Sequence, residues 1–379
     1  MKIRLSLLPL LAVLLAAPCA RAQKNSSQII GYVFSRGQAL NAKDIAAKKL
    51  TRIHYAFINT RDGALADLTP MQTSDLATLV SLKKINPALT IVASTGGFAR
   101  SEDFSDIALT PTSRAKFVAS CLHLVETQNL DGIDVDWEYP AFPRPNGRFR
   151  AADKQNYTLL LRDLRMAFDT AGTRLHRHLV TSTATNGNMF FINNTELAQV
   201  AKYVDTIALM GYDYYDRSDP TTGNHSPLFT DPADPKKLSD DQSVRDYLAA
   251  GVPPEKIVLG VPFYGHGWTG VPSANHGLFQ PVPKGRMFDV LYTEIAKKNL
   301  APGSGFTRYW DAASAVPYIY NPATQTFITY DDPESMKRKC AYVREKHLSG
   351  IMFWAYNGDP DNILLGAINT GLHSTTKEK

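Results

Sequence analysis

The stretch DGIDVDWEYP, residues 131–140, decides the fold, because it reads as a buried strand that carries four carboxylates. Side chains in a strand alternate between two faces, so Asp134, Asp136 and Glu138 share one face. The isoleucine, valine and tryptophan between them share the other face. In a barrel the apolar face would pack on the surrounding helices, and the acidic face would point to the interior.

Similar β-branched or aromatic runs recur along the chain, and helix-like amphipathic segments, such as 113–129 and 156–172, separate most of them. We predict strands at 28–34, 52–58, 89–94, 132–138, 179–185, 204–212, 256–264 and 350–356. Strict alternation of strand and helix indicates a parallel sheet. Eight such strands suit a closed α/β barrel, the (β/α)8 TIM barrel, better than an open doubly wound sheet.

One interval breaks this alternation, because the chain between strands seven and eight is too long for a single crossover. Within it, residues 307–332 read as hairpin strands. We therefore predict a small α+β domain at 267–333, inserted between strands seven and eight. The catalytic barrel would then comprise residues 28–266 and 334–372.

The first 22 residues have the layout of a secretory signal peptide: two early basic residues, an apolar run and a small-x-small end at Ala20 and Ala22. The run is too short to span a bilayer. Without this leader, 38 basic side chains face 36 acidic ones, and the net charge falls from +5 to +2. That balance does not indicate a nucleic-acid or membrane-surface protein. We expect a secreted or periplasmic monomer.

Two cysteines remain after the leader, Cys121 and Cys340, and both lie in helix-like segments far apart in the sequence. An oxidising compartment would permit one bridge between them. A chain of this length can bury a full core without disulfides. We expect two reduced, buried thiols.

The acidic row of strand four suggests acid catalysis. Its successive members are about 6.5–7 Å apart along the strand, and Glu138 lies at the carboxyl end, where barrel active sites form. Carboxylates this close do not all ionise readily at low dielectric, so at least one should keep its proton near neutral pH. A protonated carboxylic acid at the mouth of a barrel can act as a general acid.

Two structural alternatives are a cation site and a set of acids paired with buried Arg and Lys. Apart from one aspartate, the side chains predicted to point inward from the other strands are aromatic or neutral: Tyr32, Phe57, Ser94, Met210, Tyr212, Asp213, Tyr264 and Trp354. A metal cluster would require more carboxylates or histidines there. The nine histidines show no ligand spacing, and we expect most of them to be surface residues or buried polar residues with satisfied hydrogen bonds. The sequence therefore favours a catalytic acid and predicts neither a metal nor a cofactor.

The motif DGIDVDWEYP resembles the Asp-x-x-Asp-x-Asp-x-Glu signature of glycoside hydrolase family 18, the chitinase family. Other stretches resemble family motifs in the same order, over essentially all of 28–372: STGG (94–97), MGYD (210–213), GVPFYG (260–265), NHSPL (224–228), TYDDPES (329–335) and FWAYNGD (353–359). The resemblance is to bacterial chitinases that carry the inserted α+β domain. It implies hydrolysis of β-1,4 linkages between N-acetylglucosamine units with retention, the substrate's acetamide being the nucleophile.

By this resemblance, Glu138 is the general acid and then the base that activates water. Asp136 orients the acetamide N–H, Asp134 holds Asp136, and Tyr212 and Asp213 grip the acetamide. Trp354 forms the floor beneath the sugar. The resemblance also assigns substrate binding to Tyr32, Phe57, Gly96, Gly97, Phe98, Tyr139 and Met210. The expected partner is chitin or N-acetylglucosamine oligosaccharides.

Three positions depart from the family pattern without touching the acidic row. Phe98 stands where tryptophan is frequent, His266 where arginine is common, and Ala355 where glutamate is frequent. With histidine in place of arginine at position 266, it stays open whether the sugar contact near the cleavage point is kept. GHGWTG (265–270) fits Gly-x-Gly-x-x-Gly, but Pro272 follows it closely, so we interpret it as a loop rather than a dinucleotide site.

Three aromatic residues near this stretch have two possible roles. Trp268, Tyr309 and Trp310 either line sugar subsites or belong to the core of the inserted domain. Two other functions also stay open for the whole chain. One is a chitin-binding lectin on the same barrel, and the other is an endo-β-N-acetylglucosaminidase acting on N-glycan cores. The intact Glu138 argues against the lectin, and the insertion, which would deepen a groove for a long polymer, favours chitin.

Overall fold

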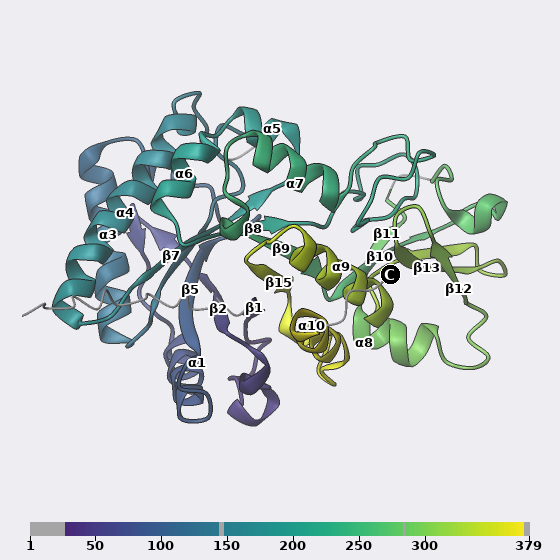
Figure 1. Ribbon diagram of the computed structural model, residues 1–379, viewed down its shortest axis with the longest axis horizontal. Helices are drawn as coiled ribbons and strands as arrows, with labels where there is room; N and C mark the ends of the chain where they lie inside the picture. Colours follow the sequence, from purple (N-terminus) through teal and green to yellow (C-terminus); the bar gives the residue numbers. More distant parts are fainter. Residues whose placement is uncertain (1–26, 144–147, 283–284, 375–379) are drawn as a thin grey trace, which may run out of the picture.

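The computed structural model describes residues 27–143, 148–282 and 285–374, and Figure 1 shows its arrangement. The predicted leader, residues 1–22, lies outside the described residues. Eight parallel strands form a closed barrel in the order β1-β15-β9-β8-β7-β6-β5-β2. Their bounds are Gln28–Val33 (β1), Arg52–Ile58 (β2), Thr90–Gly96 (β5), Gly132–Asp136 (β6), Val180–Asn186 (β7), Thr206–Met210 (β8), Ile257–Pro262 (β9) and Gly350–Trp354 (β15). The predicted (β/α)8 barrel is confirmed.

Helices cover the outside of this barrel, on the left in Figure 1. The longer ones are α1 (Pro70–Ser81), α3 (Pro111–Thr127), α4 (Asp153–Leu175), α6 (Leu197–Tyr203), α7 (Asp240–Ala249), α9 (Pro333–Glu345) and α10 (Ile363–His373). Shorter elements are α2 (Phe104–Ile107), α5 (Met189–Asn193), α8 (Tyr292–Glu294) and the hairpin β3 (Thr60–Arg61) and β4 (Ala64–Leu65). Helix α3 begins where Thr110 accepts the backbone N–H of Ser113 and a proline occupies the first turn.

The central strand β6 has the two faces that its sequence predicts. Ile133 and Val135 are fully buried in the main apolar core between barrel and helices. Trp137 follows the end of the strand on the same side and stacks on Phe104, with 5.7 Å between ring centroids. We predicted that Glu138 would lie within this strand. Strand β6 ends at Asp136, so Glu138 lies two residues after its end.

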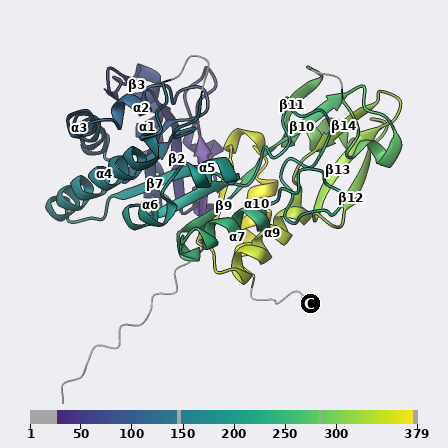
Figure 2. The same ribbon diagram turned by 90° about the horizontal axis from the view of Figure 1, so that it is seen from above.

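A second, antiparallel sheet lies between β9 and β15 in the sequence and beside the barrel in space, as Figure 2 shows. Its order is β11-β10-β14-β13-β12, and its bounds are Tyr264–Thr269 (β10), Met287–Leu291 (β11), Thr307–Asp311 (β12), Val316–Asn321 (β13) and Thr326–Thr329 (β14). The predicted hairpin strands in 307–332 are therefore present. The proposed domain limits, 267 and 333, stay a prediction.

The interpretation of GHGWTG as a loop is wrong, because these residues form most of strand β10. They pair with β11 on one side and with β14 on the other. Trp268 on this strand is buried in the apolar core of the second sheet. Of the two roles considered for Trp268, the core role is the one that the structure supports.

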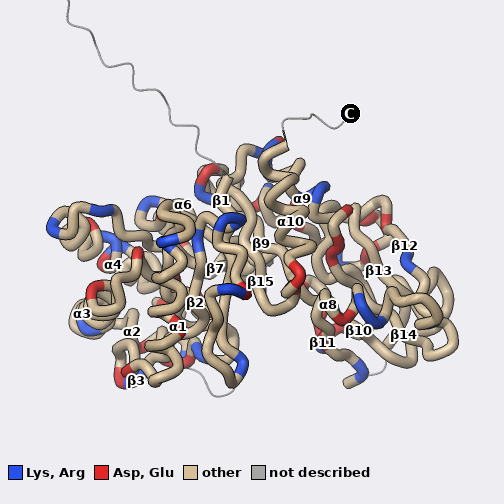
Figure 3. The backbone as a smooth tube through the Cα atoms, turned by 90° about the horizontal axis from the view of Figure 1, so that it is seen from below, with Lys and Arg blue, Asp and Glu red and all other residues tan. Residues whose placement is uncertain are grey.

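Cys121 and Cys340 are both free and buried, as expected. Among the described residues, no helix is both long and apolar enough to cross a membrane. Figure 3 shows basic and acidic positions interspersed along both the barrel and the second sheet.

Candidate active site

A cavity of about 1050 Å³ opens at the carboxyl ends of the barrel strands. Most of the predicted site residues line it: Tyr32, Phe57, Phe98, Asp136, Glu138, Tyr139, Met210, Tyr212, Asp213 and Trp354. Residues of β11 and α8 in the second sheet region, including Asp289 and Glu294, complete its wall. The cavity is thus shared between the barrel and the inserted segment.

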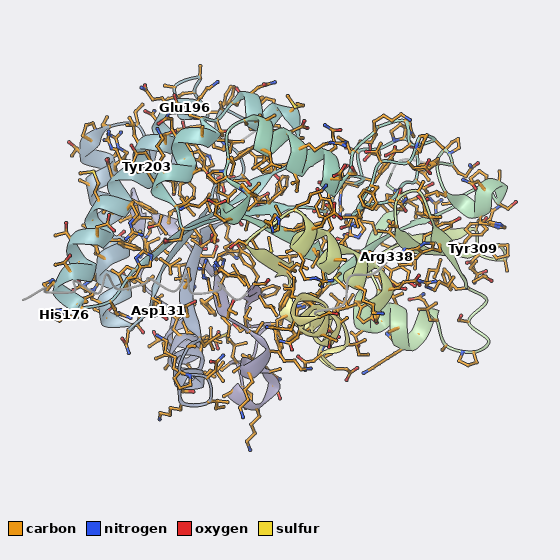
Figure 4. The ribbon with its side chains drawn as sticks, in the orientation of Figure 1. Asp131, His176, Glu196, Tyr203, Tyr309 and Arg338 are labelled. Atoms are coloured by element: carbon orange, nitrogen blue, oxygen red, sulfur yellow. The ribbon has the colours of Figure 1, made fainter. Side chains whose placement is uncertain are left out.

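The fourth acid of the motif does not belong to this site. Asp131 precedes β6, and its carboxylate contacts Lys83 and Arg177. Figure 4 labels Asp131 beside the barrel helices and Tyr309 at the far end of the second sheet. Trp268, Tyr309 and Trp310 are likewise absent from the described cavity lining.

Asp134 lies at the bottom of the acidic row, fully buried inside the barrel. Three hydroxyl groups donate hydrogen bonds to its carboxylate: Tyr32 at 2.7 Å, Ser94 at 2.7 Å and Ser182 at 2.8 Å. Burial alone would raise the pKa of Asp134, but the contact with His54 and the hydroxyl hydrogen bonds lower it to about 2. Asp134 is therefore a fixed negative charge beneath the cavity.

Asp136 is the second acid of the row and is also buried. Burial raises the pKa of Asp136 well above its ordinary value, and the like charges of Glu138 and Asp134 raise it further. Its Oδ1 atom is buried without a hydrogen-bond partner among the described residues. The crowding predicted from the sequence therefore acts most clearly on Asp136.

Glu138 lies at the top of the row, where it lines the cavity with only 8% of its surface exposed. Its backbone N–H donates to Ser101 Oγ at 3.0 Å, which ties the segment after β6 to the segment after β5. The next residue, Tyr139, has its hydroxyl held by the side-chain amide of Asn186 at 3.1 Å. Both contacts hold the segment at the carboxyl end of β6 in place.

Gly96 and Gly97 are absent from the described cavity lining but allow β5 to approach β6 closely. Gly96 has φ +109°, and a Cβ there would lie 2.1 Å from the backbone oxygen of Asp136. Gly97 has φ +85°, and a Cβ there would lie 2.7 Å from the Phe57 ring. Gly97 N–H donates to Asp136 O at 2.7 Å. We infer that their contribution to the site is backbone geometry.

An aromatic floor crosses the cavity around Trp354. Its indole stacks on Phe34 and Phe57, with ring centroids 5.4 and 5.5 Å away, and Tyr32 lies 5.4 Å from it at an angle. Aromatic faces of this kind suit the apolar faces of sugar rings. Phe98 extends from the rim and is 67% exposed, which leaves a second apolar surface open to a ligand.

Tyr212 and Asp213 follow the end of β8, two strands from β6 in the barrel, and line the cavity wall there. Burial raises the pKa of the Tyr212 phenol well above its ordinary value, and the charge of Asp213 raises it further. Asp213 Oδ1 accepts hydrogen bonds from the Tyr264 hydroxyl at 2.5 Å and from His266 Nε2 at 2.9 Å. Asp213 is thus held in place by two neighbours from strand β10.

Sequence reasoning missed part of this wall. His225 lies 3.6 Å from Asp213, and His266 Nδ1 lies 2.9 Å from Asp289. Most of the nine histidines are exposed, as expected, but His54, His225 and His266 are buried. The sequence shows no ligand spacing among the histidines, yet His225 and His266 lie beside Asp213 in this wall. The four residues of the cluster come from separate segments, so spacing along the chain gives no signal for it.

A closed (β/α)8 barrel whose cavity combines a row of carboxylates with an aromatic floor has the groups that a glycosidase uses. The sequence comparison is consistent with this class, because the model of glycosyl hydrolases family 18 matches residues 28–359. The chain belongs to this family.

Two sequence relatives are similar over most of this chain. Chitinase A1 of Niallia circulans is 32% identical over 94% of this chain and 60% of its own length. Chitinase B of Serratia marcescens is 29% identical over 85% of this chain and 76% of its own length. The chain thus spans less than two thirds of the length of Chitinase A1.

A solved structure of a family 18 N-acetylglucosaminidase from Paenibacillus barengoltzii is similar over almost its whole length. It is 38% identical, with a TM-score of 0.85, over 91% of this chain and 99% of that one.

Proposed function

We propose that the protein is a secreted chitinase that hydrolyses β-1,4 linkages between N-acetylglucosamine units with retention. The observation that carries this proposal is the buried, unpartnered Oδ1 of Asp136 at the cavity. A buried carboxylate oxygen without a donor is costly, by about 1–3 kcal/mol or more. The acetamide N–H of an N-acetylated sugar would supply the missing donor.

The proposed reaction has two steps. In the first, Glu138 gives its proton to the glycosidic oxygen, the bond from C1 to that oxygen breaks, and the acetamide carbonyl oxygen bonds to C1. Asp136 accepts the acetamide N–H and stabilises the cationic oxazolinium ring. In the second step, Glu138 removes a proton from water, whose oxygen bonds to C1 and releases the acetamide. Two inversions at C1 give net retention.

The neighbours of the acidic row support these roles. Asp134 contributes a buried negative charge on the cation's side of the cavity. Tyr212 and Asp213 would hold the acetamide, and Trp354 would carry the sugar ring on its face. Substrate bound across the cavity would contact both the barrel and the second sheet.

The test is digestion of an N-acetylglucosamine hexamer, with products separated by size and their anomers followed by NMR early in the reaction. The expected result is hydrolysis with initial β-anomers. Absence of hydrolysis, with the oligomer still bound, would favour the chitin-binding lectin instead. Initial α-anomers would contradict retention.

A second candidate is an exo-acting N-acetylglucosaminidase. Its support is the similarity to the Paenibacillus barengoltzii enzyme, which extends over 99% of that chain. The same digestion separates the two: an internal cut gives dimers to tetramers early, whereas exo action gives only the monomer and the pentamer. Release of N-glycans from a glycoprotein, with one N-acetylglucosamine left on each asparagine, would instead identify the endo-β-N-acetylglucosaminidase activity.

A further inference from the structure

We propose that the cavity wall after β8, which carries Asp213, holds an inhibitory site for a divalent transition metal of the Zn²⁺ class. Its ligands would be Asp213, His225 and His266. One ligand atom from each lies within 4.8 Å of the others. Nitrogen from two histidines and oxygen from one carboxylate suit Zn²⁺, Ni²⁺ or Cu²⁺ rather than Ca²⁺ or Mg²⁺. The metal has no role in the proposed hydrolysis.

His225 provides the independent observation that points to a ligand. Its side chain is fully buried, yet neither Nδ1 nor Nε2 has a hydrogen-bond partner among the described residues. Its closest acceptor, Asp213 Oδ1, lies 3.6 Å from Nδ1, beyond hydrogen-bond distance. A neutral imidazole left in this state keeps the lone pair of one ring nitrogen, which a metal would use.

His266 is already oriented as a metal ligand. Its Nδ1 lies 2.9 Å from Asp289, so the ring is held by a carboxylate on the side away from Asp213. This carboxylate–histidine arrangement is the usual support for a metal-bound imidazole. Nε2 then lies 2.9 Å from Asp213, a contact that requires a proton between the two atoms. A divalent cation can replace that proton.

The dimensions of the cluster require only small adjustments. Zn²⁺ binds nitrogen and oxygen at about 2.0–2.2 Å, so two ligand atoms on one ion are at most about 4.2 Å apart. Side-chain rotations on the order of 1 Å would bring the present set within that limit. The carboxylate of Asp213 is about half exposed, at 49%, and lines the cavity. A water or a substrate oxygen can therefore complete the coordination.

Inhibition rests on the proposed function, because it requires that Asp213 bind substrate. Metal binding itself does not depend on that function. We would titrate ZnCl₂ into the metal-free, full-length mature chain by calorimetry, and record the visible spectrum with Co²⁺ as a substitute probe. We expect one ion per chain, a tetrahedral Co²⁺ spectrum and a rise in unfolding temperature with Zn²⁺. Glu138→Gln should bind Zn²⁺ as the wild type does.

His225→Asn and His266→Gln should each weaken Zn²⁺ binding at least ~10-fold, because losing a ligand should cost at least as much as losing an outer-shell partner of a ligand. The matched control is His123→Asn, at an exposed histidine on α3, which should not change binding. Unfolding temperatures without metal show whether each variant is folded, and two ligand variants are tested because one can fail to fold.

The outcomes separate the two proposals. Zn²⁺ binding that depends on His225 or His266, in a chain that hydrolyses no oligomer, supports the site and contradicts the function. Oligomer hydrolysis without stoichiometric Zn²⁺ binding, or with binding equal in the ligand and control variants, overturns the site. When both proposals hold, Zn²⁺ raises KM for the oligomer in the wild type.

Discussion

The buried charge of Asp134 should set the alkaline limit of activity, and Asp134→Asn tests this. Asp134 and Asp136 are two residues apart on β6, a spacing of about 6.5–7 Å in a strand. Because the pKa of Asp134 is about 2, it stays charged throughout the working pH range. A neighbouring negative charge disfavours ionisation of Asp136, so removing that charge should lower the pKa of Asp136.

The size of the effect follows from Coulomb's law. Two unit charges about 7 Å apart interact by about 2.4 kcal/mol at an effective dielectric constant of about 20. Since ~1.4 kcal/mol changes an ionisation constant tenfold, the shift is ~1–2 pH units. In the proposed reaction, Asp136 and Glu138 together must retain a proton. The alkaline limb of kcat/KM should therefore move to lower pH by ~1–2 pH units in Asp134→Asn.

The assay is the pH profile of kcat/KM with a soluble, fluorogenic N-acetylglucosamine oligomer. Ser182→Ala is the matched control, because it removes one 2.8 Å hydrogen bond from Asp134 but keeps the charge. Its alkaline limb should stay in place. The electrostatic reasoning is refuted if the alkaline limb of Asp134→Asn does not move or moves to higher pH. It is also refuted if the alkaline limb of Ser182→Ala moves equally.

Three further results are expected. Glu138→Gln should lower kcat at least ~100-fold while oligomer binding by calorimetry persists, and near-normal turnover would place the acid elsewhere. Tyr212→Phe, which removes only the hydroxyl, should lower kcat by ~10–100-fold at nearly unchanged unfolding temperature; a loss that follows stability would assign the ring a packing role. Burial raises the pKa of Asp240 to about 7, so the folded state holds a proton that the unfolded state releases above about pH 4. The free energy of unfolding should therefore fall between about pH 4 and 7 through this group, and the fall should be smaller in Asp240→Asn by chemical denaturation; an identical slope would contradict the assignment.

The barrel and the acidic row could be predicted because local sequence encodes both. Period-two alternation in 131–140 places three acids on one face, and this holds whatever surrounds the strand. Strand ends were less predictable. Glu138 and Tyr212 both lie two residues past the strands predicted to contain them, because pairing with neighbouring strands decides where a ladder stops.

Strand β10 shows why local sequence failed in the second sheet. Pro272, close after this stretch, suggested a loop, yet Gly267 packs against Phe288, where a Cβ would lie 2.3 Å from the ring. Gly265 likewise approaches the backbone oxygen of Thr329, with 2.5 Å to a Cβ. Here glycine is required by close approach of partners that are distant in sequence. The histidine cluster escaped prediction for the same reason.

The wall that carries Tyr212 and Asp213 is stabilised from behind by buried charges. Ser226 Oγ donates to Gly211 O at 2.6 Å, which closes the loop between these residues and His225. The fully buried Lys339 ammonium donates to Ser226 O at 2.8 Å and to Asp331 at 2.8 Å. Burying a lysine ammonium costs free energy unless its hydrogen-bond donors are satisfied. A buried ion pair is therefore weak evidence for a gain in overall stability. Lys339 is better explained by its geometry: one ammonium from α9 ties the loop after β8 to the segment that follows β14, so the loop that carries Asp213 is positioned by both parts of the molecule.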